Sequence, residues 1–432
     1  MPEKKRMTRR DFIRGSVAVA GAFALPAIVP RRVLGGPGHT PPSEVITRAV
    51  IGTGSRGMLY VRNGANKPDE TPSLLVVCDV YRRHLDDALA HAGPGCRGYS
   101  DYRYVLDRKD IDVVYVVTPP HWHSLISVHA AQAGKDIYCE KPMTRFIHEG
   151  RVMADAMERY GAMLQIATSS RFREDTRRMR KLVMSGLLGS GLLVRMPRSR
   201  YDWKVSEWSG KTDLKPEPVP EGLDWDMWLG PAPYKPYHPQ RCWGHFRGYW
   251  DYDGGGFADM GAHFFDGIQY IIGMDDSGPV EIESKAPWPQ HPDAVGMWGS
   301  ITYRFPNDIT VRCTSGEWGD ETDDHDAPFI EGSKGKLYHG LKTDPPGLLE
   351  VSDKLPDPPV LLNLDEAIRQ RKQPGGNAEV AHRVSTILHL GNISIRLGRK
   401  LQWDPVKEQF VNDAEANRLV NIPMRAPWQL QA

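Results

Sequence analysis

Asp259 and His263 are four residues apart, so on a helix their side chains lie one above the other on a single face. An imidazole that titrates near neutrality is a suitable general base for a hydroxyl proton. A carboxylate beside it can orient the ring and favour its charged form. A helix-surface pair or cap is the simpler alternative, but the preceding Gly254-Gly255-Gly256 favours a site that acts on one small molecule.

Residues 52–57, Gly-Thr-Gly-Ser-Arg-Gly, form a G-x-G-x-x-G motif. Gly52 permits a tight turn, Gly54 lets the backbone approach a pyrophosphate, and Gly57 lets a helix and a strand pack closely. The helix that follows would direct its N-terminus, with Ser55 and Arg56, at the diphosphate. The motif predicts that this part of the chain binds a dinucleotide.

Asp79 ends the next predicted strand, about 20 residues beyond the glycine motif. An acidic side chain at this position can accept both hydroxyls of an adenosine ribose, which favours NAD. Arg82 and Arg83 follow closely and could instead hold a 2'-phosphate. The sequence therefore predicts NAD and leaves NADP open.

Two further loops follow predicted strands, and loops at the carboxyl ends of parallel strands are expected to carry chemistry. The first runs from Thr118 and Pro119 to His123, and the second is Glu140-Lys141-Pro142. The residues of these loops that we expect to bind the cofactor are Thr118, Pro119, His123, Glu140 and Lys141. A lysine ammonium can stabilise a developing alkoxide, and the proline fixes the loop that presents it. His121 and His123 have no carboxylate or cysteine at ligand spacing, so we expect them to begin a helix and predict no metal.

The elements that must position these residues alternate between strand and helix, which predicts a parallel sheet covered by helices. The expected strands are 45–52, 73–78, 113–118, 136–139 and 163–167, and the expected helices are 58–63, 122–133 and 147–160. This predicts a Rossmann dinucleotide-binding domain over residues 45–168.

After Arg171 the pattern changes. We expect a helix over 174–185 and an antiparallel hairpin that joins 301–305 to 309–313, because apolar and polar residues alternate strictly there. A helix is expected over 377–397, and residues 222–250 form a long aromatic loop region. The tryptophans of this half more often pack than stack on sugar rings; they include Trp203, Trp208, Trp225, Trp228, Trp243 and Trp250.

Together these motifs resemble the Gfo/Idh/MocA family, which contains glucose-fructose oxidoreductase and inositol dehydrogenase. The matching pieces are the glycine motif, Thr118-Pro119 with His123, Gly134-Lys135 before Glu140-Lys141-Pro142, and Asp259-x-x-x-His263. The resemblance implies that Lys141 points at substrate and nicotinamide, and that Asp259 and His263 contact the substrate hydroxyl. It also implies a second α+β domain, over 169–402, with an open, mostly antiparallel sheet whose outer face pairs subunits into a dimer or tetramer. Residues 403–432 would form a tail.

The first 36 residues are expected to be a twin-arginine export signal, since Arg9-Arg10-Asp11-Phe12 precedes a mildly apolar run from Val17 to Val29. This run is short and contains Pro26, which disfavours a permanent membrane anchor. We therefore expect a periplasmic protein that meets the export machinery. Such proteins are commonly loaded with cofactor before export.

Lysine plus arginine number 55 against 54 acidic residues, so nucleic acid is not an expected partner. The five cysteines form no CxxC pair, and we expect most of them to pack in the core. The sequence as a whole favours a nicotinamide-dependent oxidoreductase acting on a sugar or polyol. One alternative is an NAD-dependent glycosidase working through a keto-sugar, but the glycosidases that resemble this family carry an apolar residue at the position of Lys141. The other is a binding protein without turnover, which the presence of both Lys141 and His263 disfavours.

Overall fold

The structure is a computed structural model that describes residues 41–68, 70–196, 210–286, 291–295, 300–314 and 327–431. The predicted export signal, Trp203 and Trp208 lie outside the described residues. The chain divides into a small unit, Met1–Val45 with Lys67–Thr71, and a large unit that comprises Ile46–Asn66 and Pro72–Ala432. The small unit contains the 3-10 turn η1 (Pro42–Glu44), and the large unit contains both sheets and the candidate site.

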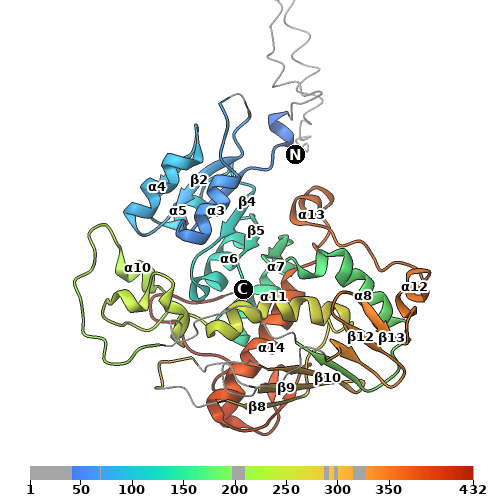
Figure 1. Cartoon of the computed structure of the whole chain (residues 1–432). Coiled ribbons are helices and arrows are strands. Elements are labelled where there is room, and N and C mark those ends of the chain that lie inside the picture. Colours follow the sequence, from blue (N-terminus) through green and yellow to red (C-terminus); the bar gives the residue numbers. More distant parts are fainter. Residues whose placement is uncertain are drawn as a thin grey trace, which may run out of the picture. The chain divides into compact units, whose positions relative to one another are not determined.

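The first sheet has six parallel strands in the order β3-β2-β1-β4-β5-β6. Its strands are β1 (Arg48–Ile51), β2 (Leu74–Cys78), β3 (Arg97–Tyr99), β4 (Val113–Val116), β5 (Asp136–Cys139) and β6 (Leu164–Ile166). Most of their residues are apolar and buried, as expected for strands covered on both faces. The covering helices are α3 (Ser55–Asn63), α4 (Arg82–Ala92), α5 (Tyr102–Leu106), α6 (His123–Gln132) and α7 (Ile147–Tyr160) (Figure 1). The predicted Rossmann-like sheet is confirmed.

The strand order reverses at β1, which pairs with β2 on one side and with β4 on the other. A crevice forms at such a point because the loops after the two central strands run in opposite directions. The glycine motif follows β1 and Thr118-Pro119 follows β4, so both open into this crevice. Helix α3 begins at Ser55 instead of the predicted Met58, because its first turn belongs to the glycine motif and has few apolar residues.

The second sheet has nine strands in the order β13-β12-β11-β7-β10-β9-β8-β14-β15, and only β7 and β10 pair in parallel. Its strands are β7 (Leu192–Arg195), β8 (Glu281–Lys285), β9 (Ser300–Phe305), β10 (Ile309–Cys313), β11 (Ile330–Glu331), β12 (Lys336–Tyr338), β13 (Lys342–Asp344), β14 (Leu401–Asp404) and β15 (Gln409–Phe410). The predicted hairpin is present as β9 and β10, with Asn307 and Asp308 in left-handed conformations at its turn. The predicted open, mostly antiparallel sheet is confirmed, and it continues past residue 402.

One face of this sheet is buried. Every second residue of β9 and β10 packs inward, including Tyr303 and Val311, whereas Arg304 and Arg312 on the other face are exposed. The buried core also holds α8 (Glu174–Met184), α11 (Gly255–Ile271) and α14 (Ala378–Leu397). Helix α14 also contacts α7 of the first domain and β8 of the second sheet, so it joins the two domains (Figure 1).

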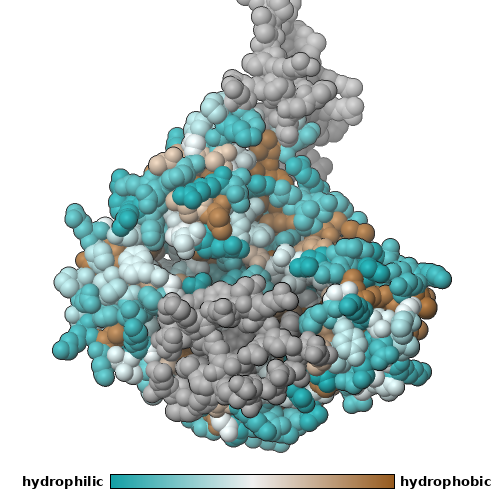
Figure 2. All heavy atoms as spheres, viewed as in Figure 1, coloured by the Kyte–Doolittle hydropathy of each residue, from teal (hydrophilic) through white to brown (hydrophobic). Residues whose placement is uncertain are grey.

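Shorter elements complete the described chain. They are the 3-10 turns η2 (Pro120–Trp122), η3 (Ser170–Phe172), η4 (Pro239–Arg241) and η5 (His245–Gly248), and the helices α10 (Trp225–Leu229), α12 (Leu348–Asp353), α13 (Leu364–Gln370) and α15 (Ala414–Asn417). Figure 2 shows a mainly hydrophilic described surface on the face drawn. Among the described residues, no helix combines the length and apolar character that a membrane span requires.

Candidate active site

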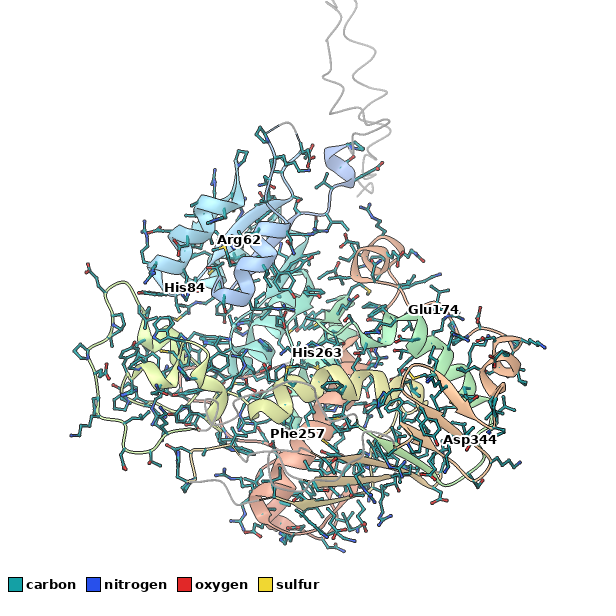
Figure 3. The ribbon with its side chains drawn as sticks, viewed as in Figure 1. Arg62, His84, Glu174, Phe257, His263 and Asp344 are labelled. Atoms are coloured by element: carbon teal, nitrogen blue, oxygen red, sulfur yellow. The ribbon has the colours of Figure 1, made fainter. Side chains whose placement is uncertain are left out.

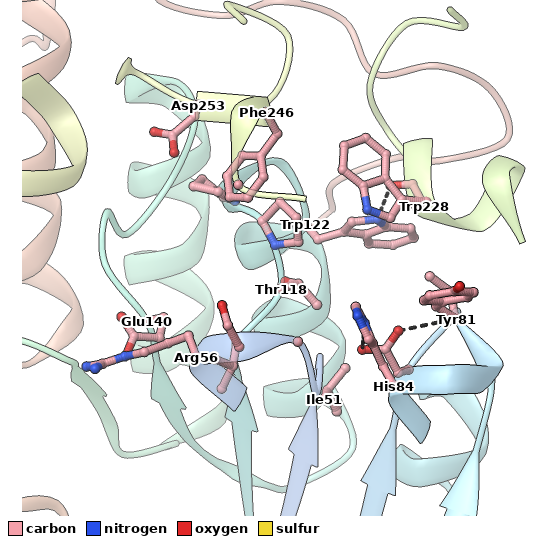
Figure 4. A pocket seen from close by; sticks show the side chains of 18 of the residues that line it. Ile51, Arg56, Tyr81, His84, Thr118, Trp122, Glu140, Trp228, Phe246 and Asp253 are labelled. Carbon is pink, nitrogen blue, oxygen red and sulfur yellow. Dashed lines mark hydrogen bonds and ion pairs between the residues drawn. The ribbon is translucent and has the colours of Figure 1, made fainter. Parts of the chain in front are cut away.

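A cleft of about 620 Å³ runs along the carboxyl ends of the first sheet and is closed on its other side by the second half of the chain (Figure 4). The side chains come from both halves: Figure 3 labels His84 on the first domain and His263 on α11. The residues predicted to form the site that line this cleft are Gly54, Ser55, Arg56, Asp79, Thr118, Pro119, Glu140, Lys141, Asp259 and His263. Three others, Gly52, Gly57 and His123, do not line it.

The glycines of the motif have different surroundings. Gly52 has φ +88°, and a Cβ there would lie 2.7 Å from the carbonyl oxygen of Val117. A Cβ on Gly57 would lie 1.9 Å from the carbonyl oxygen of Gly52, so this glycine allows α3 to pack against β1. A Cβ on Gly54 would meet nothing closer than His84, at 3.8 Å. The space beside Gly54 therefore belongs to the cleft, as close approach of a phosphate requires.

Asp79 closes the other end of the glycine turn. Its Oδ2 accepts a hydrogen bond from the Thr53 amide (2.7 Å), and its Oδ1 accepts one from the Tyr81 amide (2.9 Å). The Nδ1 atom of His84 lies 3.6 Å from Oδ2. Arg82 is exposed and pairs with Asp86 at 2.8 Å instead of facing the cleft. The cleft therefore presents a carboxylate, and not this arginine, at the position expected for the adenosine ribose.

His123 connects the two chemistry-bearing loops from behind. Its ring is fully buried, with Nε2 2.7 Å from the carbonyl oxygen of Thr118 and Nδ1 2.9 Å from that of Pro142. Burial lowers the pKa of this histidine, and the hydrogen bonds to the two carbonyl oxygens oppose that shift. His123 thus holds the loop after β4 against the loop after β5, and it positions the site without lining it.

Glu140 connects the second loop to the glycine-rich helix. Its Oε1 accepts hydrogen bonds from Arg56 Nε and from the Tyr60 hydroxyl, each at 2.6 Å. Its Oε2 accepts one from the Lys141 amide at 3.2 Å. Because Glu140 is buried and Arg56 is half exposed, this ion pair fixes the start of α3 relative to Lys141 and leaves part of the guanidinium in the cleft.

Lys141 and Asp259 form an ion pair inside the cleft. Lys141 Nζ lies 2.9 Å from Asp259 Oδ2 and donates a hydrogen bond to the Asp259 carbonyl oxygen at 3.1 Å. Arg247 Nε lies 3.0 Å from Asp259 Oδ1 on the other side. Burial disfavours the charged carboxylate, but the two cations outweigh it and lower the pKa of Asp259. Asp259 therefore orients Lys141, whereas the sequence suggested that it would orient His263.

His263 lies one turn along α11 from Asp259 and lines the same cleft. Burial and the positive charge of Lys141 lower its pKa. The imidazole is therefore neutral at neutral pH, which is the form that can accept a proton. The helix is held in place through this residue's backbone, because the Ser170 hydroxyl donates to the His263 carbonyl oxygen at 2.5 Å.

Sequence reasoning missed Arg247 and Asp253. Asp253 is fully buried at the cleft wall, and burial together with the nearby Asp259 carboxylate raises its pKa. Asp253 stands directly before the glycine triplet, which was a usable signal. Arg247 lies in the aromatic loop region, where nothing in the local pattern indicates a partner twelve residues away.

The tryptophans of that region are mostly packing residues, as expected. Trp225 and Trp228 stack on each other with ring centroids 4.8 Å apart, and both are buried, as is Trp250. Trp228 and Trp243 both line the cleft, but only Trp243 of these residues is exposed, at 40%. The five cysteines are all unpaired, and four are buried.

The cleft fits a dinucleotide. The open space at Gly54 lies at the N-terminus of α3, where no side chain caps the first amides. Thr118 lines the same cleft, and its buried hydroxyl has no hydrogen-bond partner within the described part of the chain. Within the same part, no group of three or more histidine, cysteine, aspartate or glutamate side chains is placed to hold a metal ion.

The parallel sheet with its glycine turn, and the cation, carboxylate and imidazole beside it, define the class of two-domain nucleotide-binding oxidoreductases. Residues 46–168 match the family model of the NAD-binding Rossmann fold of the oxidoreductase family, and residues 172–430 match that of its C-terminal alpha/beta domain. The chain belongs to this family, Gfo/Idh/MocA.

Among curated relatives, the rhizopine catabolism protein MocA of Rhizobium meliloti is 27% identical over 52% of this chain and 57% of its own length. Inositol 2-dehydrogenase of Salmonella paratyphi B is 26% identical over 34% and 43%. A glycosyl hydrolase family 109 protein of Shewanella is 26% identical over 39% and 40%. The matches thus span between 40% and 57% of the length of these relatives.

Solved structures extend the likeness to nearly the whole fold. The WlbA dehydrogenase of Bordetella pertussis, solved with NADH and UDP-GlcNAcA, matches with a TM-score of 0.57 at 17% identity, over 83% of this chain and 99% of its own. At this identity the comparison establishes the shared fold.

Proposed function

We propose that this chain carries a tightly bound NAD and transfers hydride between it and a secondary hydroxyl or keto group of a sugar or polyol. The observation that carries the proposal is the meeting of Lys141, Asp259 and His263 in the cleft that also holds Gly54 and Asp79. One curated relative, inositol 2-dehydrogenase, is by its name a dehydrogenase of a polyol.

The residues divide the work of alcohol oxidation. When bound, the nicotinamide supplies the two-electron hydride acceptor. The neutral imidazole of His263 takes the hydroxyl proton, and the Lys141 ammonium, held by Asp259, stabilises the negative charge that develops on the substrate oxygen. In the reverse direction His263 returns the proton to the ketone oxygen.

We favour NAD over NADP because Asp79 faces the cleft and Arg82 pairs with Asp86 outside it. A 2'-phosphate beside Asp79 would meet a like charge without that arginine as a counter-ion. Liquid chromatography of the nucleotide released from purified protein distinguishes the two, and released NADP would overturn this preference.

We also propose that the chain is exported, on the strength of its Arg9-Arg10 pattern. An exported enzyme has no exchangeable NAD pool, so the cofactor must be loaded first and regenerated by a redox-neutral cycle, with a second substrate taking the hydride back. Fractionation of cells carrying Arg9→Lys with Arg10→Lys tests this step. Unchanged periplasmic recovery of that variant would contradict it.

The main experiment desalts the purified protein exhaustively, records the absorbance and fluorescence of the retained nicotinamide, and adds single sugars without external NAD. We expect reduction of the bound cofactor by one sugar and its reoxidation by a second, with ping-pong kinetics. If the desalted protein contains no nucleotide and is active only with added NAD, tight retention is contradicted. The protein would then be a conventional dehydrogenase that exchanges its cofactor.

The second candidate is an NAD-dependent glycosidase, which the family 109 relative favours. In that reaction a sugar hydroxyl would be oxidised to a ketone by the bound NAD, and loss of the neighbouring acidic proton would expel the aglycone. Water would then add to the resulting enone, and the hydride would return to the ketone. The ion-paired Lys141 favours oxidoreduction instead. A panel of p-nitrophenyl glycosides separates the two, because p-nitrophenol release without net change of the bound cofactor would identify the glycosidase.

A further inference from the structure

One end of the cleft is built by a segment from the second half of the chain, residues 222–247, which we term the outer segment. It is tied to the loop after β2 by backbone contacts. Arg82 N donates to the Gly222 carbonyl oxygen at 2.9 Å, and Asp224 N donates to that of Val80 at 3.0 Å. Tyr81 and Leu223 form an antiparallel bridge between these hydrogen bonds.

Three aromatic rings meet where the outer segment crosses this loop. The ring of Trp243 lies 5.2 Å from that of Tyr81 and 5.6 Å from that of His84, and Tyr81 and His84 are 5.0 Å apart. All three line the cleft. Tyr81 and His84 lie on the opposite side of the pocket from Glu140 and Arg56 (Figure 4). The aromatic group is therefore at the Asp79 end, away from Lys141.

Trp243 is held there by an unusual backbone. Its φ is +52° and that of Gly244 is +97°, so two consecutive residues adopt left-handed conformations, which are costly for a bulky side chain. The indole Nε1 donates to the Tyr237 hydroxyl at 3.3 Å, and yet 40% of the residue remains exposed. A large aromatic surface is thus fixed in place without being covered by the protein.

We propose that Trp243, with Tyr81, clamps the adenosine half of the bound dinucleotide and so retains the cofactor. The inference rests on the proposed NAD binding. Asp79 marks the expected ribose position, and Tyr81 and His84 both contact its carboxylate, so an adenine on that ribose would lie within reach of the aromatic group. Stacking on an aromatic face contributes about 1–3 kcal/mol per base, which slows release. Since Trp243 comes from the substrate half, cofactor release requires the two halves to separate there.

The test compares Trp243→Ala and Trp243→Phe with the wild-type holoprotein. Both variants keep a Cβ at the left-handed position, so backbone strain is matched and only the ring differs. Tyr234→Ala is the control, because Tyr234 is a 64% exposed aromatic residue of the outer segment that does not line the cleft. Melting temperatures establish that each variant is folded.

The readout is the rate at which nicotinamide leaves desalted protein in excess ADP-ribose. Trp243→Ala should lose it about 10- to 100-fold faster, whereas Trp243→Phe should lie between and Tyr234→Ala should match wild type. Calorimetry on charcoal-treated protein should show that Trp243→Ala weakens ADP-ribose binding and leaves nicotinamide mononucleotide binding unchanged.

Equal retention by Trp243→Ala and wild type would overturn the clamp while leaving NAD binding intact. If Trp243→Ala retains the cofactor like wild type but has a raised KM for sugar, Trp243 contacts the substrate instead. That result would also overturn the clamp. Absence of NAD or ADP-ribose binding by the wild-type protein would contradict the proposed function itself. If Trp243→Ala is unstable, the comparison is made with Trp243→Phe alone. A Trp243→Phe variant that releases nicotinamide at the wild-type rate would refute a role for the indole.

Discussion

Lys141 and Asp259 lie 118 residues apart in sequence, and their side chains meet at 2.9 Å. The lysine follows β5 of the first domain and the aspartate belongs to α11 of the second. The pair places the ammonium at the boundary between the cofactor region and the substrate region. Because Arg247 also contacts Asp259, the carboxylate keeps one cation if Lys141 is removed.

We expect Lys141→Ala to abolish turnover while the protein stays folded and keeps its cofactor. The loss should be about several hundred-fold or more, on the scale of one group acting in the transition state. Lys407→Ala, at a 69% exposed lysine, is the matched control. Steady-state rates and nicotinamide content measure both effects. Near wild-type activity in Lys141→Ala would remove the lysine from the mechanism.

We expect His263→Ala to lower the turnover rate by a factor comparable to that of Lys141→Ala. The pH dependence of the wild-type rate should identify the general base. The pKa of His263 lies below 6.5, so the neutral, active ring persists to lower pH. The kcat/KM value should therefore fall only as pH drops through a value below 6.5. The Asp253→Asn variant should show the same fall in kcat/KM at low pH. If that fall disappears in the variant, the titrating group is Asp253 and not His263.

Gly54→Val should fold normally and lose the dinucleotide. A Cβ at Gly54 has at least 3.8 Å of room in the protein, so the collision arises only with a pyrophosphate. Gly57→Val is the contrasting variant, because its Cβ would lie 1.9 Å from a backbone oxygen and should disrupt folding. Circular dichroism and nucleotide content distinguish the two. Normal dinucleotide content in Gly54→Val would refute the assigned phosphate position.

Arg171→Leu should destabilise the fold by about 3–5 kcal/mol. The Arg171 side chain is fully buried, and it pairs with Asp266 of α11 at 2.6 Å and with Asp275 at 3.2 Å. Removing it leaves the Asp266 carboxylate buried without its cation. Denaturant unfolding provides the measurement, and Arg173→Ala, at a 66% exposed arginine, should change the free energy of unfolding by less than about 1 kcal/mol.

We expect a dimer or tetramer in solution. The outer face of β9 and β10 presents Thr302, Arg304, Thr310 and Arg312, and a sheet face of this kind can pair with its copy. Light scattering at micromolar concentration tests the prediction, and Arg304→Glu with Arg312→Glu should shift the mass toward the monomer. A monodisperse wild-type monomer would be inconsistent with it.

The sequence predicted the local features well, because short-range patterns determine them. The glycine motif, the strands and the β9–β10 hairpin follow from turn chemistry and apolar periodicity. Contacts between distant segments were not predictable in this way. Helical spacing suggested that Asp259 serves His263, but the fold brings Lys141 and Arg247 to that carboxylate instead. His123 was expected at the cofactor, but its ring is buried and contacts the carbonyl oxygens of Thr118 and Pro142, so it braces two loops.

Helix α14 contacts α7, and Trp428 packs on Trp122 with ring centroids 4.9 Å apart, so residues near 380–430 complete the core of the first domain. Without them, part of that core would be open to water. During translation, the dinucleotide-binding domain therefore reaches its final packing only after residues 425–430 have emerged from the ribosome. Expression of residues 45–168 alone should accordingly yield an aggregation-prone fragment.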